Sequence, residues 1–111
     1  MATALVYHTD FAQYDFGEDH ALRQIRVRLA RDLISQYGLL TGAEEIPPAP
    51  ASEDVVRRVH TPEYLSVVKD LSVQPSGVAY EHGLGTTDNP VFEGMYEAAL
   101  LHVGGTLRAC E

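Results

Sequence analysis

Cysteine is almost absent from this chain of 111 residues. The one cysteine, Cys110, has no second cysteine with which to form an intrachain disulfide. It also lacks the further cysteine and the paired histidines that a zinc ribbon or a zinc finger requires. A disulfide-stapled fold and a small zinc module are therefore both excluded.

Basic residues are also scarce, with 8 Lys and Arg against 16 Asp and Glu, for a net charge of −8. Binding to nucleic acid requires clustered Lys and Arg, so we expect no nucleic-acid partner. An acidic surface would suit a cationic partner such as a Lys-rich peptide or a polyamine, although most acidic proteins are merely soluble. The charge alone leaves both interpretations open.

Long apolar runs are missing as well. No segment approaches the roughly 20 apolar residues that span a bilayer, so we expect no membrane partner. Residues 1–8 have no basic stretch, and their apolar run is shorter than that of a signal peptide. These observations and the cysteine usage predict a cytoplasmic protein.

The first half of the chain is predicted to contain a strand and a helix. Residues 2–7 form a short apolar run rich in strand formers. Residues 21–37 contain neither Gly nor Pro, carry apolar residues at helical spacing and are followed by Gly38, which together predict a helix. Three prolines make residues 41–52 a connector, with a short extended piece around Ile46.

The second half is predicted to contain three helices and one long loop. Capping residues and prolines at first helical positions mark where the helices begin. The predicted segments are a short helix over residues 52–59, a helix over 61–71, a loop over 72–90, and a last helix that starts near Pro90, is capped by Asp88 or Asn89, and continues to the end.

The last predicted helix is apolar almost all the way round, and such a helix requires cover on several sides. Small residues form a stripe along it that permits close approach of another element, and the chain contains no obvious partner for this stripe. We therefore expect the 111 residues to be the first part of a larger α/β domain, truncated within this helix. Its uncovered apolar surface could permit self-association. The stripe consists of Gly94, Ala98, Gly105 and Ala109.

Arg26 falls in the middle of the apolar face of the first helix, among residues that include Leu22 and Leu29. Arg28 and Arg31 point away from this face and are expected to be solvated. Arg26 could be a structural residue whose stem packs on the apolar face, or a partner in a salt bridge. Alternatively, its guanidinium could line an internal cavity and hold an anion or a polar product.

The histidines give no local metal motif. His20, at the start of the first helix, could be a ligand, a base or a capping residue. No HxxxH, HxH or DxH pair is present, so a metal site would require ligands that converge from distant positions. No nucleophile lies in a GxSxG elbow. The remaining histidines, which we interpret as structural or solvated, are His8, His60, His82 and His102.

Asp88 lies in a glycine-containing loop that lacks the lysine of a phosphate-binding P-loop. Two roles are open for its carboxylate. It could cap the last helix, or it could accept backbone N–H groups from a bound peptide at the tip of the loop.

Five blocks of residues, in order along nearly the whole chain, carry a resemblance to a known family. They are residues 14–20, 26–28, 32–39, 59–65, and 88–96 with Gly104 and Gly105. With these blocks the chain resembles the N-terminal part of the histone deacetylase superfamily, and within it the bacterial acetoin utilisation deacetylases most.

The resemblance implies an arginase/deacetylase α/β fold with a parallel central sheet. Residues 1–111 would be the N-terminal portion of a single deacetylase domain, ending before its metal-binding half. The parent protein would be a zinc-dependent deacetylase that hydrolyses acetyl-lysine peptides or small acetylated amines. The alternative is a non-catalytic binding or interaction protein that retains only the first part of the fold.

The resemblance also assigns residues. Asp88 matches the rim aspartate that holds the substrate backbone, and Arg26 matches an arginine of the internal cavity. Tyr14 matches an aromatic residue near that cavity. The family's catalytic residues and zinc ligands match no residue here, so this chain alone is expected to bind no zinc and to be inactive. The chain also departs from the family at residues 20–24, where two prolines are replaced by Ala21 and Gln24.

Overall fold

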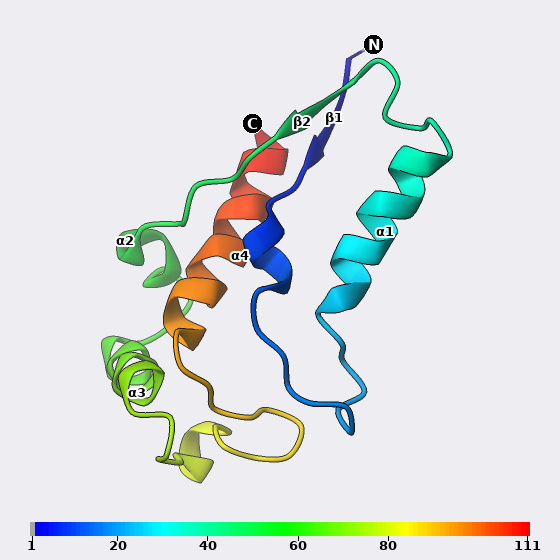
Figure 1. The fold of residues 1–111 in the computed structure, drawn as a ribbon. Coiled ribbons are helices and arrows are strands. Elements are labelled where there is room, and N and C mark those ends of the chain that lie inside the picture. Colours follow the sequence, from blue (N-terminus) through cyan, green and yellow to red (C-terminus); the bar gives the residue numbers. More distant parts are fainter. Residues whose placement is uncertain (1) are drawn as a thin grey trace.

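The computed structural model describes residues 2–111. Met1, the first residue of the domain predicted over residues 1–111, lies outside the described residues. The chain combines short parallel strands with helices (Figure 1). In chain order the elements are β1 (Thr3–Val6), the 3₁₀ helix η1 (Thr9–Ala12), α1 (Ile25–Gln36), β2 (Ala43–Ile46), α2 (Glu53–Val56), α3 (Pro62–Val73), the 3₁₀ helix η2 (Tyr80–His82) and α4 (Met95–Cys110).

The two strands form a parallel pair. Their register runs from Thr3 opposite Ala43 to Val6 opposite Ile46, and the Tyr7 N–H extends it by donating to the Ile46 carbonyl at 3.2 Å. Parallel strands require a crossover connection, which α1 provides. The predicted first strand, the extended piece around Ile46 and the α/β class with a parallel sheet are confirmed.

The molecule is a thin slab of 46 × 34 × 17 Å. α4 lies in its middle, with β1 and η1 on one side and α3 on the other, while α1 stands apart next to η1 (Figure 1). The radius of gyration of 15.9 Å exceeds the roughly 13 Å typical of a compact domain of this length. Even Leu65 and Leu84 keep 5% of their surface exposed. The chain therefore encloses little interior of its own.

A small apolar core lies between α3, the loop around η2 and the start of α4. Its buried members are Leu71, Ala79, Leu84 and Met95. α3 begins as the sequence predicts: the Thr61 hydroxyl accepts the Tyr64 N–H at 3.2 Å, and Pro62 is the first helical residue.

α1 begins at Ile25, four residues later than predicted. The Nδ1 atom of His20 accepts the Leu22 N–H at 3.0 Å, so the side chain binds a backbone group in a non-helical conformation. This local bond competes with helix formation over residues 21–24.

α4 begins at Met95, five residues later than predicted, because Gly94 adopts a left-handed conformation with φ of +77°. The capping residues predicted for it are used elsewhere. The Asn89 side chain donates to the Gly83 carbonyl at 2.8 Å, and the Asn89 N–H donates to the Thr86 hydroxyl at 3.1 Å. The prediction that Asp88 or Asn89 caps this helix is wrong.

The predicted apolar face of α1 is exposed, with 43% of Leu22, 54% of Leu29 and 53% of Leu33 accessible to solvent. The helix turns a different face toward η1 and β2. There Arg31 is half-buried: its Nε donates to Glu45 Oε2 at 3.0 Å, and its guanidinium lies 5.7 Å from the centre of the Tyr7 ring. The prediction that Arg31 is solvated is wrong, because its guanidinium pairs with Glu45 and lies over the Tyr7 ring.

One member of the small-residue stripe, Gly105, has a partner within the chain, contrary to the prediction, whereas Ala109 is exposed. Gly105 lies against Phe11 of η1, and the adjacent Gly104 lies against the backbone of residues 49–51. The Ala51 N–H donates to the Leu100 carbonyl in the middle of α4 at 2.9 Å. Two glycines therefore allow η1 and the proline-rich connector to dock directly on α4.

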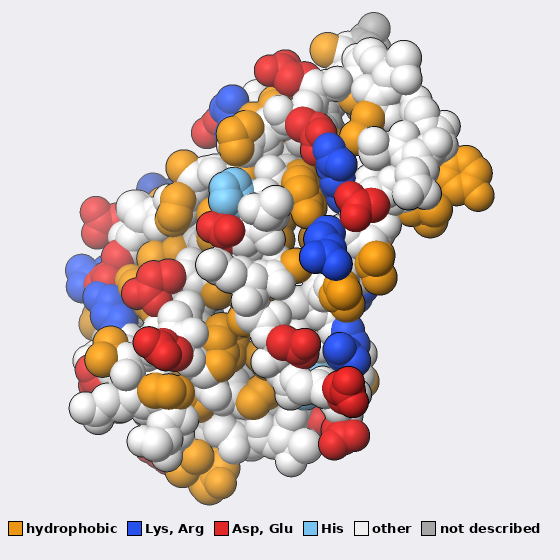
Figure 2. Space-filling model, in the orientation of Figure 1, with side chains coloured by type: hydrophobic (Ala, Val, Ile, Leu, Met, Phe, Trp, Pro, Cys, Tyr) orange, Lys and Arg blue, Asp and Glu red, His pale blue; other side chains and the backbone are white. Residues whose placement is uncertain are grey.

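Charged side chains are scattered over the face seen in Figure 2, with acidic groups across it and several basic groups aligned on the α1 side. Apolar side chains are interspersed among them, in keeping with the thin core. Among residues 2–111, no helix has both the length and the apolar character needed to cross a bilayer.

Glu53 ties α2 to α3 and α4. Its carboxylate pairs with Lys69 and with Arg57 at 2.9 Å, and accepts the Tyr96 hydroxyl at 2.8 Å. The hydrogen bonds from Lys69 and Tyr96 lower the pKa of Glu53 from 4.5 to about 2. The folded state therefore favours the ionised carboxylate.

Glu53→Gln is expected to lower the melting temperature at pH 7. A carboxylate with a depressed pKa stabilises the fold above pH 4.5, and this contribution is lost as the pH falls toward 2. The difference from wild type should therefore shrink in thermal melts recorded from pH 7 to pH 2. Glu44→Gln, an exposed control on β2, should change little. A constant difference at every pH would contradict the ionic role of Glu53.

Candidate functional site

An aromatic cluster, defined as Tyr14, Phe16, His20 and Phe92, joins the segment after η1 to the segment before α4. The rings of Tyr14 and Phe92 stack with centroids 4.6 Å apart and planes inclined by 13°. Phe16 lies 5.5 Å from Phe92 and 4.6 Å from the His20 ring. Aromatic pairs at these distances attract one another beyond their buried area, so the cluster holds two distant loops together.

Asp88 lies on the exposed edge of this cluster. Its carbonyl oxygen is 3.2 Å from Nε2 of His20. Its carboxylate is exposed and, within residues 2–111, makes neither a hydrogen bond nor an ion pair. The backbone of Asp88 is thus anchored, while its two carboxylate oxygens remain available as acceptors.

Tyr14 also reaches α4. Its hydroxyl lies 3.3 Å from Nε2 of His102, and the His102 ring stacks on Phe11 with centroids 5.0 Å apart. Burial lowers the pKa of His102, and the nearby positive charge of Arg26 lowers it further. Tyr14 and His102 are therefore in contact, and the exposed Arg26 acts on the His102 ring through its charge.

Arg26→Ala is expected to raise the pKa of His102, because the substitution removes a positive charge that disfavours the imidazolium. An NMR titration of the His102 ring measures the shift directly. Arg28→Ala, two residues along the same helix and also exposed, is the matched control and should leave the titration unchanged. Equal effects of the two substitutions would contradict the proximity of Arg26 to His102.

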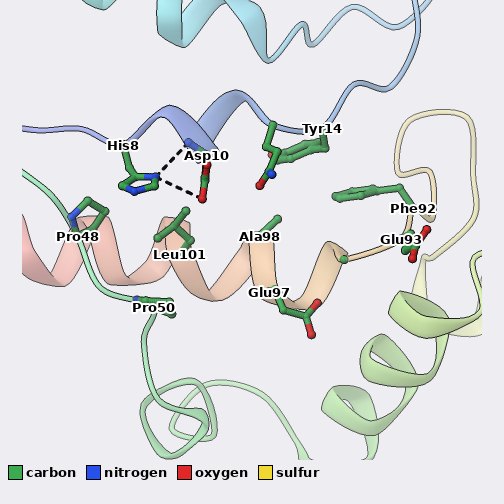
Figure 3. Close-up of a pocket in the computed structure, with 12 residues that line it drawn as sticks. His8, Asp10, Tyr14, Pro48, Pro50, Phe92, Glu93, Glu97, Ala98 and Leu101 are labelled. Atoms are coloured by element: carbon green, nitrogen blue, oxygen red, sulfur yellow. Dashed lines mark hydrogen bonds and ion pairs between the residues drawn. The ribbon is translucent and has the colours of Figure 1, made fainter.

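Two hollows flank Tyr14. The larger, of about 520 Å³, lies between η1, the proline-rich connector and α4, with Tyr14 and Phe92 at one end (Figure 3). The smaller, of about 220 Å³, includes His102 and Phe92. Arg26 and Asp88 line neither hollow. Of the three predicted site residues, Tyr14 alone lines these two hollows.

A hydrogen bond orders the rim of the larger hollow. Nδ1 of His8 accepts the Asp10 N–H at 3.1 Å and lies 3.5 Å from the Asp10 carboxylate (Figure 3). The His8 side chain thus caps the start of η1. Within residues 2–111, no three His, Cys, Asp or Glu side chains converge as metal ligands.

The site therefore offers recognition groups: an exposed carboxylate on an anchored loop, a tyrosine and histidine pair, and a nearby guanidinium. The sequence indicated Asp88, Tyr14 and Arg26 as site residues. It did not indicate that His20 contacts Asp88 or that His102 contacts Tyr14. The contacting residues are separated by 68 positions for His20 and Asp88 and by 88 for Tyr14 and His102. No local pattern signals such pairs.

Comparison with known proteins identifies relatives of this chain. Residues 20–111 match the histone deacetylase domain. The chain is 37% identical to the acetoin utilization protein AcuC of Bacillus subtilis, over 98% of this chain and 29% of that protein. It is 29% identical to the AcuC protein of Staphylococcus aureus, over 95% and 28% of the two chains, and 29% identical to histone deacetylase HDAC1 of Drosophila melanogaster, over 93% and 20%.

The chain thus spans less than a third of the length of each of these relatives. The resemblance to the histone deacetylase superfamily and to the acetoin utilisation proteins is confirmed. With most of its length matched by the domain, the chain belongs to the histone deacetylase domain family.

Proposed function

We propose that the protein carrying this chain is a zinc-dependent deacetylase that hydrolyses acetyl-lysine peptides or small acetylated amines. Membership of the histone deacetylase family supports the reaction class. The residues of this chain do not fit a zinc site, because no suitable ligand set converges within residues 2–111. We therefore assign the zinc ligands and the reacting groups to the rest of the protein, and derive no step through the metal from this chain.

Within that enzyme, this chain supplies part of the substrate rim. The observation that carries this proposal is the state of Asp88: its backbone is anchored, its carboxylate is exposed, and it does not cap α4. A carboxylate in this state can accept two backbone N–H groups from an extended peptide, with charge-assisted hydrogen bonds. Such bonds would hold the peptide backbone and leave the acetylated side chain free to enter the active site.

Arg26 and Tyr14 are proposed to form part of an internal cavity wall. For Tyr14, the contact with His102 and the adjoining hollows support this assignment. For Arg26, the support is that its charge acts on the same His102 ring. A guanidinium next to a cavity would stabilise an anionic product such as a carboxylate. The exposed apolar face of α1, which carries Arg26, would be covered by the remainder of the domain.

Metal removal tests the proposed reaction. The full protein is expected to release acetate from an acetyl-lysine peptide or a small acetylated amine, to lose this activity when the metal is chelated, and to regain it with added zinc. Activity that survives complete metal removal would contradict the zinc dependence. Binding of acetyl-lysine peptides without hydrolysis of any acetylated substrate would instead favour the non-catalytic alternative.

A further inference from the structure

We propose that His20 is a positioning residue for the substrate rim, holding Asp88 by its backbone so that the carboxylate faces the bound peptide. This inference rests on the proposed role of Asp88 and extends it to a residue that does not itself touch substrate. Its basis is a pair of hydrogen bonds through the two nitrogens of one imidazole ring.

The hydrogen bonds define the state of the ring. Nδ1 of His20 lies 3.0 Å from the Leu22 backbone nitrogen, which can only donate, so Nδ1 is the acceptor. Nε2 lies 3.2 Å from the Asp88 carbonyl oxygen, which can only accept, so Nε2 carries the proton. The neutral Nε2–H tautomer alone satisfies both partners. The ring therefore bridges the segment before α1 and residues 83–89, which we call the rim loop.

The other polar contacts of the rim loop do not position it in this way. The Gly85 N–H donates to the Asn89 carbonyl at 2.9 Å, and Asn89 bonds to Thr86 and Gly83. These bonds fix the shape of the loop, but all of them lie within it. The bond from His20 and the contacts of Phe92 with Tyr14 and Phe16 join this region to the segment before α1.

Because the hydrogen bond acts on the carbonyl of Asp88 itself, it restrains the backbone from which the carboxylate projects. Losing it would leave the loop folded but allow Asp88 to change its position relative to a bound peptide. Small misplacements of a binding group weaken affinity without removing the group. A small acetylated amine without a peptide backbone would not be affected.

Two substitutions separate the two bonds. In His20→Asn, the side-chain oxygen can replace Nδ1 as the acceptor for Leu22, but the amide is too short to reach the Asp88 carbonyl. In His20→Gln, the side-chain NH₂ can replace Nε2 as the donor to Asp88. The Asn variant thus tests the rim bond, and the Gln variant tests its rescue.

The experiment measures KM and kcat of the full protein on an acetyl-lysine peptide and on a small acetylated amine, in both variants and in combination with Asp88→Asn. His20→Asn is expected to raise the peptide KM about fivefold, the effect of one lost neutral hydrogen bond, with little change in kcat. His20→Gln should recover most of this loss. The small amine should be processed as in wild type, and the His20→Asn effect should vanish in the Asp88→Asn background.

Several results would overturn the inference. Equal losses in the Asn and Gln variants, equal losses on peptide and small amine, or full additivity with Asp88→Asn would each show that His20 does not act through Asp88. A ¹⁵N NMR spectrum with the proton of the His20 ring on Nδ1 would also overturn it, independently of how the variants fold. An unchanged peptide KM and kcat in Asp88→Asn alone would instead overturn the proposed role of Asp88.

Discussion

Gly104→Ala is expected to destabilise the protein by about 3 kcal/mol or more, although alanine is normally the better helix former by about 1 kcal/mol. A Cβ atom at this position would overlap the Ala49 carbonyl oxygen and would lie 3.0 Å from the Ala51 backbone nitrogen. Both neighbours are backbone atoms, so no side-chain rotation can relieve the overlap. The connector would have to move off α4 and lose the bond from Ala51 to Leu100.

The midpoint of chemical denaturation measures this loss. Thr106→Ala, on the exposed side of the same helix, is the matched control and should be close to neutral. Gly105→Ala should be intermediate, because its Cβ would meet the end of the Phe11 ring at 2.8 Å, and a ring can shift further than a peptide group. A Gly104→Ala protein as stable as wild type would show that the connector does not dock on α4.

In the full protein, if it has the proposed activity, Asp88→Asn is expected to lower kcat/KM on acetyl-lysine peptides at least tenfold, or by about 1.4 kcal/mol of transition-state binding, while the melting temperature stays the same. The carboxylate makes no bond within residues 2–111, so the fold does not depend on its charge. Two backbone N–H groups of a peptide, however, require two acceptor oxygens. Asparagine offers one oxygen and an unwanted donor.

Substrate choice provides the control for Asp88→Asn. Hydrolysis of a small acetylated amine, which has no peptide backbone to hold, should change much less than hydrolysis of the peptide. Asp88→Ala should behave like Asp88→Asn on both substrates, since each removes the paired acceptor. If the Asn variant processes peptide and small amine as efficiently as wild type, Asp88 does not contact the peptide backbone.

Local chemistry explains which features the sequence predicts. Thr61 and Pro62 mark the start of α3 because a hydroxyl cap and a fixed proline φ act within one turn, and the structure confirms both. The apolar run that forms β1 is equally local. The residue blocks that carry the family resemblance are also short, and they are sufficient to indicate the α/β class.

Features that depend on more than one turn of local sequence were not predictable in this way. Asp88 and Asn89 precede a proline and fit the pattern of a helix cap, yet Asn89 bonds back to Gly83, and the left-handed Gly94 delays α4. For α1, the density of apolar residues indicated which face would be buried. In the structure a different face, which carries Arg31, packs on the chain through contacts with Tyr7 and Glu45. The contacts of Asp88 with His20 and of Tyr14 with His102 join segments that are far apart in the sequence, so they form only in the folded chain.

The unequal burial of α1 and α4 has a consequence for local unfolding. α1 contains no buried residue and is linked to β2 by the ion pair of Arg31 with Glu45, whereas α4 buries Met95, Gly104 and Gly105. Segments with few buried contacts open at a lower free energy than the core. Backbone amides of α1 will therefore exchange with solvent deuterium through local opening, while those in the middle of α4 require the separation of η1 and the connector.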